Sequence, residues 1–206
     1  MLAGLLVIHV TVPFSDESES VGLLIRTLAL VVLCLGGYLL FHARAWVVTY
    51  LAISVPALIL GVLGGANPDA VGLGTAADVL GFLISLLLFV AVIRFALFDA
   101  EAPQVDRIVA GICGYLLLAL MWSSLYQVAD RFVVDGFRTV DGVGQLPHNG
   151  EALYFSVVTI TTLGYGDITP VNSWIRMLAS LQALTATLFL AVFISSLVSR
   201  SGQKSG

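Results

Sequence analysis

Residues 161–170, TTLGYGDITP, place hydroxyl, glycine and carboxylate groups between two long apolar stretches. Gly164 and Gly166 stand at alternate positions, and glycine adopts backbone angles that other residues resist. An extended backbone with consecutive carbonyl groups facing one way is therefore possible here. Rings of such carbonyls replace the hydration shell of a bare cation when several copies surround an axis. The chemistry that this stretch offers is cation coordination by the backbone itself.

A short apolar segment before this stretch must position it. The polar, glycine-rich run RFVVDGFRTVDGVGQLPHNG is followed by EALYFSVVTITT, 12 residues of apolar and hydroxyl character. Twelve residues are too few to cross a bilayer, so a re-entrant helix over 150–161 is predicted. Asn149 suits its N-cap, and Glu151 lies favourably at the positive helix end. Irregular backbone at membrane depth must be packed by protein or face a watery cavity.

The overall composition is that of an integral membrane protein. Of 206 residues, 59% are hydrophobic and only 11% are charged, and the mean hydropathy is +1.02. The net charge is −4, and the nine basic residues are scattered singly along the chain. We therefore expect the lipid bilayer as a partner and no nucleic acid. Cys34 and Cys113 lie inside apolar runs, where small buried side chains are expected.

Five stretches are long and apolar enough to be transmembrane helices. A span needs about 20 apolar residues, and the stretches that meet or nearly meet this length are 21–41, 46–64, 75–98, 107–129 and 173–199. The opening run 1–14 would reach only about 21 Å as a helix, so it is a stub, an interfacial piece or a sixth span. The predicted fold is all-α, with five to six transmembrane helices, a re-entrant pore helix and a filter loop.

The segment EALYFSVVTITTLGYGDITPVNSWIRM resembles the pore helix, filter and inner-helix start of tetrameric potassium channels. Thr162 to Gly166 is similar to the signature Thr-Val-Gly-Tyr-Gly, with Leu163 in place of Val. The resemblance is to the small prokaryotic type without a cytosolic regulatory domain. It implies N-terminal transmembrane helices over 1–98 and a pore domain over 99–206. Within that domain the implied elements are the outer helix 107–129, the pore helix 150–161, the filter 162–166 and the inner helix 173–199.

The same resemblance implies which atoms bind the permeant ion. The K⁺ ligands would be the backbone carbonyls of the filter together with one hydroxyl, contributed by Thr162, Leu163, Gly164 and Tyr165, with Gly166 closing the motif. The side chains of Leu163 and Tyr165 would point into the supporting wall. K⁺ is then the permeant ligand, and no cofactor is expected.

The residues behind the filter depart from the family pattern. Small bacterial channels often carry a glutamate four residues before the filter threonine and a tryptophan three residues earlier, where this chain has Val158 and Phe155. Neither side chain can hydrogen-bond Asp167. We therefore expect filter support from packing and from the pore-helix hydroxyls, namely Thr159 with the Tyr165 hydroxyl, and Thr161.

By resemblance, the inner helix lines the central cavity and the lower gate through Thr187, Leu190, Ile194, Ser195 and Val198. Ordinary helix packing is the alternative for each of them. No glycine occurs between residues 173 and 199, and Ala186 stands where the family often bends this helix. A sharp hinge is therefore not expected there.

The resemblance also implies a homotetramer in the plasma membrane, multi-pass, with a cytoplasmic C-terminus. If 1–14 crosses, the stretch 75–98 takes the place of a voltage-sensor helix, yet it carries only one basic residue, Arg94. Steep voltage dependence needs about three to four gating charges per subunit, so weak or absent voltage gating is predicted. Arg26 and Asp78, both near outer helix ends, could form an intramembrane pair.

The predicted function is passive, potassium-selective conduction. The alternatives are a non-conducting or regulatory subunit, which the extra helices could serve, and a less selective cation channel. An enzyme is not expected, because no nucleophile with a companion base is recognisable. His9, His42 and His148 likewise stand without metal-ligand or catalytic companions at useful spacing.

Overall fold

The structure, a computed structural model, describes residues 1–11, 44–66, 70–99, 102–146 and 149–203. The predicted span 21–41 and Arg26 lie outside these residues. The helices are α1 (Leu2–Thr11), α3 (Arg44–Ala66), α4 (Val71–Phe98), α5 (Gln104–Phe132), α6 (Asn149–Ile160) and α7 (Ser173–Gln203). The short strands are β1 (Phe137–Thr139), β2 (Gly142–Gly144) and β3 (Thr169–Pro170).

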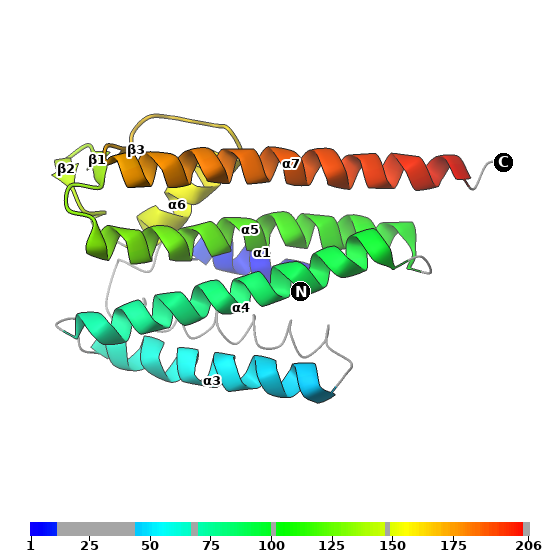
Figure 1. Ribbon diagram of the computed structural model, residues 1–206, viewed down its shortest axis with the longest axis horizontal. Helices are drawn as coiled ribbons and strands as arrows, with labels where there is room; N and C mark the ends of the chain where they lie inside the picture. Colours follow the sequence, from blue (N-terminus) through cyan, green and yellow to red (C-terminus); the bar gives the residue numbers. More distant parts are fainter. Residues whose placement is uncertain (12–43, 67–69, 100–101, 147–148, 204–206) are drawn as a thin grey trace.

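The long helices lie side by side, as Figure 1 shows. Helix α4 packs between α3 and α5, and the short α6 lies between α5 and α7. The three strands gather at the end of the bundle where α7 begins, and the C-terminus lies at the opposite end (Figure 1). This arrangement brings the chain back from α6 to the start of α7 through residues 161–172.

Three of the described helices, α4, α5 and α7, are long and apolar enough to cross a membrane. The apolar part of α3, Val48–Gly64, is shorter than these three helices, and α1 has 10 residues, about 15 Å of helix. Helix α1 is thus a packed stub rather than a span of its own over Leu2–Thr11. The chain is an all-α multi-pass membrane protein, while the total of five to six spans stays a prediction.

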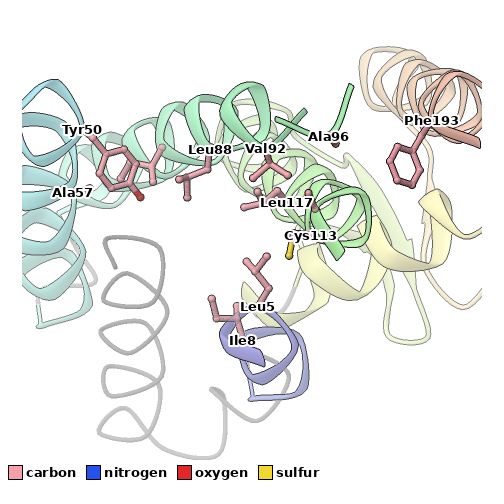
Figure 2. Packing of buried hydrophobic residues seen from close by; sticks show 12 residues of the cluster. Leu5, Ile8, Tyr50, Ala57, Leu88, Val92, Ala96, Cys113, Leu117 and Phe193 are labelled. Atoms are coloured by element: carbon pink, nitrogen blue, oxygen red, sulfur yellow. The ribbon is translucent and has the colours of Figure 1, made fainter. Parts of the chain in front are cut away.

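Apolar side chains from five helices form the core between the N-terminal helices and the pore segment. Figure 2 shows Leu5 and Ile8 of α1 directed toward Cys113 and Leu117 of α5. Both α1 side chains are almost fully buried. Cys113 is buried here as a free thiol, as its apolar context predicts. The rest of this core is contributed by Tyr50, Ala57, Leu88, Val92, Ala96 and Phe193, among others.

A small sheet forms where the sequence predicted only a polar loop. Strand β1 pairs antiparallel with β2 through a two-residue turn, and also with β3, in the order β2-β1-β3. The turn residues are Val140 and Asp141, and Gly142, the first residue of β2, has a φ of +129°. The sequence signal was the dipeptide Asp141-Gly142, which favours tight turns. Strand β3 begins three positions after Gly166, so the hairpin is hydrogen-bonded just beyond the predicted filter.

Two arginines connect neighbouring helices near their ends. Arg131 of α5 donates to Asp78 of α4 through Nε and Nη2, at 3.1 and 2.9 Å. Asp78 therefore pairs with Arg131, and the predicted pair with Arg26 stays a prediction because Arg26 lies outside the described residues. At the other end of the bundle, Nε of the buried Arg107 donates to the carbonyl of Ala96, near the end of α4, at 2.8 Å.

Candidate functional site

The site begins where the short helix α6 ends. Its last carbonyl, that of Ile160, has no continuing helix to bond, and it accepts a hydrogen bond of 2.6 Å from the Tyr115 hydroxyl. Tyr115 stands 11 positions after Gln104, the first residue of the 29-residue α5. The chain therefore leaves α6 deep along the length of a membrane-crossing helix. The negative end of the α6 dipole points to this place, which favours a cation.

Along the next residues the backbone angle φ alternates between positive and negative values. Thr162, Gly164 and Gly166 have φ values of +59°, +58° and +83°, whereas Leu163 and Tyr165 between them keep negative φ. Left-handed residues at every second position allow successive carbonyls to face one side, the arrangement of a ring of coordinating carbonyls. Positive φ at the β-branched Thr162 is a genuine outlier, of a kind that clusters at functional sites. The sequence indicated this backbone freedom at the two glycines, whereas the left-handed conformation of Thr162, itself a predicted site residue, was not expected.

Every residue from 161 to 167 is exposed within the single chain. Leu163 is 54% exposed and Tyr165 is 69% exposed. Irregular backbone cannot face lipid at membrane depth, because its polar groups would lack partners. Further protein or a water-filled cavity must therefore cover this stretch.

Asp167 is held by a residue that the sequence reasoning missed. The Tyr154 hydroxyl donates to Oδ2 of Asp167 at 2.5 Å. This hydrogen bond is the main reason why the pKa of Asp167 is lowered from its usual value, and it raises the pKa of Tyr154 to about 12. The expectation that packing replaces hydrogen bonding at Asp167 was therefore incomplete. Tyrosine one residue before Phe155 was the available signal.

Loss of the Tyr154 hydroxyl should move the titration of Asp167. Hydrogen bonding favours the ionised carboxylate, so the bond is present above the pKa and is lost as pH falls through it. In Tyr154→Phe we expect the pKa of Asp167 to rise toward its ordinary value. The ¹³C shift of the Asp167 carboxyl carbon, followed from about pH 6 to pH 2, measures this. Asp141 in the same spectra is the internal control, and superimposable Asp167 curves would contradict the assigned bond.

The two positions that depart from the family pattern are both buried. Phe155 is 4% exposed and packs edge-on against Tyr126 and Phe137, at ring-centroid distances of 4.9 and 5.3 Å. It thus anchors the hairpin to α5 and α6 rather than touching the filter. Val158 is buried as well. The hydroxyl of Thr161 donates back to the Val157 carbonyl, and a supporting role for Thr159 stays a prediction.

A buried polar network fixes α6 between α5 and α7. The Tyr126 hydroxyl donates to Oε1 of Gln182 at 2.7 Å, and Nε2 of Gln182 donates to the Ser156 carbonyl and hydroxyl at 3.0 and 2.8 Å. The Ser156 hydroxyl donates in turn to the Ala119 carbonyl. Tyr126, Ser156 and Gln182 are all fully buried. Each of these polar groups is satisfied, as a buried position requires.

Helix α7 presents two different sides. Gln182, Ala186, Phe189 and Phe193 lie on the side packed against α5 and α6. The predicted cavity and gate residues are exposed in the single chain: Thr187, Leu190, Ile194, Ser195 and Val198. The start of α7 is fixed by Asn172, whose Oδ1 accepts the Trp174 N–H at 2.9 Å. The same segment bonds the hairpin, since Val171 N–H donates to the Gly136 carbonyl.

Comparison with known families agrees with this geometry. Residues 112–201, which include α6, the irregular stretch and most of α7, match the family model described as an ion channel. Similar curated proteins are potassium channels. The chain is 33% identical to two-pore potassium channel 1 of Arabidopsis thaliana over 86 residues. Over residues 112–201 the chain is thus similar to ion channels, and the relatives that it resembles are potassium channels.

Other similar proteins are two pore potassium channel a of Oryza sativa subsp. japonica, 43% identical over 81 residues, and two-pore potassium channel 4 of Arabidopsis thaliana, 41% identical over 99 residues. The matches to these three channels cover 42%, 39% and 48% of this chain. They span only 21%, 20% and 35% of the relatives' own length. No solved structure matches the chain.

Proposed function

We propose that this chain is a subunit of a potassium-selective channel, with residues 162–166 as its filter. The observation that carries the proposal is the positive φ at every second residue, namely Thr162, Gly164 and Gly166. Four successive carbonyls, from Thr162 to Tyr165, would then coordinate a dehydrated cation, with the Thr162 hydroxyl at the inner mouth. The ion moves down its gradient, and no enzymatic step or cofactor is involved.

The assembly that we propose is a homotetramer. The chain contains the motif once, at residues 162–166, so one subunit supplies one quarter of a four-fold ring. The exposure of every residue from 161 to 167 within the single chain supports this, because neighbouring subunits would cover the backbone that lipid cannot. Residues 1–98 would form the peripheral transmembrane part and residues 99–206 the pore domain.

In the proposed orientation the filter faces the outside of the plasma membrane and the C-terminus is cytoplasmic. The exposed residues Thr187, Leu190, Ile194, Ser195 and Val198 would line the cavity and lower gate. Their side of α7 faces away from the packed side that holds Gln182 and Phe193. If this side of α7 faces a water-filled cavity around the four-fold axis, the exposed hydroxyl groups of a membrane-crossing helix are accounted for.

Gating by voltage should be weak. In the described part of α4 the charged residues are Asp78, which pairs with Arg131, and the exposed Arg94. One elementary charge moving through 100 mV supplies about 2.3 kcal/mol, and steep gating takes several such charges per subunit. We expect Arg94→Gln to leave the open probability against voltage nearly unchanged. A marked loss of voltage dependence in this variant, recorded in planar bilayers, would contradict the proposal that α4 does not sense voltage.

The test of the proposed function is reconstitution of the purified chain in bilayers with K⁺ on one side and Na⁺ on the other. We expect currents that reverse close to the K⁺ equilibrium potential. Reversal near zero would instead assign a less selective cation channel. Silence of the chain alone, with currents appearing only on co-expression with another pore subunit, would favour the regulatory-subunit alternative.

A further inference from the structure

The carbonyl of Ile160 is one residue from Thr161 and two from the outlier Thr162, so its position sets where the filter begins. The last four carbonyls of a helix lack intrahelical partners. The backbone nitrogens of Thr161, Thr162 and Leu163 donate to the carbonyls of Val157, Thr159 and Val158, respectively. None of these three bonds uses the Ile160 carbonyl. Its hydrogen bond comes from another helix, through the hydroxyl of Tyr115 at 2.6 Å.

The ring of Tyr115 is the first of three stacked aromatic rings, and the other two belong to α7. It stacks on Phe189 at a centroid distance of 6.1 Å and an angle of 26°. Phe189 stacks in turn on Phe193 at 5.8 Å and 4°. The three rings, here called the aromatic column, therefore run from the start of the filter to the half of α7 that carries Ile194 and Val198.

Glycines on α5 make room for this column. A Cβ at Gly111 would lie 1.9 Å from Cζ of Phe193, so any larger residue would displace that ring. A Cβ at Gly114 would lie 3.4 Å from Phe189 and 3.1 Å from Ile93, which is also tight. Gly111, Gly114 and Tyr115 thus form one surface of α5, on which the rings of α7 rest. Figure 2 shows Phe193 directed from α7 toward α5.

From this arrangement we propose that Tyr115 is a positioning residue of the filter, and that the aromatic column transmits the position of α7 to the Ile160 carbonyl. The inference rests on the proposed conduction through residues 162–166. A shift of the inner half of α7 moves Phe193 and Phe189 and removes the support of the Tyr115 ring. The hydroxyl then leaves Ile160, and the first coordinating carbonyls lose their alignment. The filter's selectivity is in this way coupled to α7, through a contiguous packed path.

The decisive variant is Tyr115→Phe, because it keeps the ring in the column and removes only the hydroxyl. A neutral hydrogen bond contributes enough to change an equilibrium by about three- to tenfold. We expect the K⁺/Na⁺ permeability ratio, taken from reversal potentials, to fall by about that factor. Ser124→Ala is the matched control, since it removes another part-buried α5 hydroxyl, one that bonds the Leu120 carbonyl of its own helix instead. An unchanged ratio in Tyr115→Phe would overturn the positioning role.

The coupling to α7 is tested by a double-mutant cycle. Gly111→Ala displaces Phe193, and Phe193→Leu removes its ring, so both should lower the permeability ratio in the same direction as Tyr115→Phe. Either change should add little when Tyr115 is already Phe. Full additivity of the effects would overturn the coupling. Phe193→Leu keeps the test available if the Gly111 variant fails to assemble.

A second readout does not depend on conduction. With a ¹³C label at the Ile160 carbonyl, the isotope-edited amide I band reports the hydrogen bond directly. We expect Gly111→Ala and Phe193→Leu to shift this band toward its position in Tyr115→Phe. An unshifted band would overturn the aromatic column even in a selective channel. A shifted band in a protein without potassium selectivity would uphold the column and contradict the proposed function.

Discussion

Gly164→Ala is expected to abolish potassium-selective conduction, while Gly144→Ala leaves it unchanged. The two glycines are matched, because an added Cβ would meet nothing within 4 Å at either position in the single chain. They differ in backbone hand, since Gly164 has a φ of +58° and Gly144 lies in strand β2 without a positive φ. The comparison therefore isolates backbone conformation from steric fit.

The expected size of the effect follows from chirality. A left-handed conformation costs an L-residue with a Cβ roughly 1–2 kcal/mol, or about 4–8 kcal/mol over four copies in one ring. That is enough to turn the peptide planes and to break the row of carbonyls. Reversal potentials in K⁺ against Na⁺ measure the loss, and sedimentation in detergent checks that the assembly, proposed to be a tetramer, still forms. Selective currents from Gly164→Ala would place the filter elsewhere.

Gln182→Leu should produce the largest loss of stability. The substitution leaves the fully buried Tyr126 hydroxyl without its acceptor and removes both bonds to Ser156. An unsatisfied buried group costs about 1–3 kcal/mol, and the lost bonds add to this. We expect a free energy of unfolding lower by about 2–4 kcal/mol, seen as a lower midpoint of thermal unfolding in detergent.

Two further variants make this expectation specific. In Tyr126→Phe/Gln182→Leu the orphaned hydroxyl is gone, so the double variant should be less destabilised than the sum of the single ones. Gln127→Leu is the control, because its Nε2 reaches Ser123 only at 3.5 Å on the same helix. We expect that change to stay within about 0.5 kcal/mol. Equal losses in Gln127→Leu and Gln182→Leu would show that the network contributes nothing particular.

The helices themselves were largely readable from apolar length. The predicted spans 107–129 and 173–199 correspond to Gln104–Phe132 and Ser173–Gln203, and the pore helix 150–161 to Asn149–Ile160. The observed long helices extend further because hydropathy counts only the apolar part, whereas backbone hydrogen bonds continue through polar ends. The predicted start of 75–98 was late for a related reason, since Gly72 and Gly74 lowered the helical signal ahead of Thr75.

The hairpin was missed because its signal is local turn chemistry in a polar run, not hydrophobic alternation. Asp141-Gly142 favours the turn, but β1 and β2 are three residues each, and a pair of that size is marginal on its own. Burial of Phe137 against Tyr126 and Phe155, and pairing with β3, supply the missing stability. These partners come from distant parts of the chain.

The sequence by itself determined which stretch could act as the proposed filter, because that chemistry belongs to the backbone and depends on glycines two positions apart. Only the tertiary structure decided what holds the filter in place. Tyr115 reaches Ile160 across 45 positions and Tyr126 reaches Gln182 across 56. No periodicity encodes such pairs, since a hydroxyl finds its acceptor only after the helices have packed and excluded every other partner.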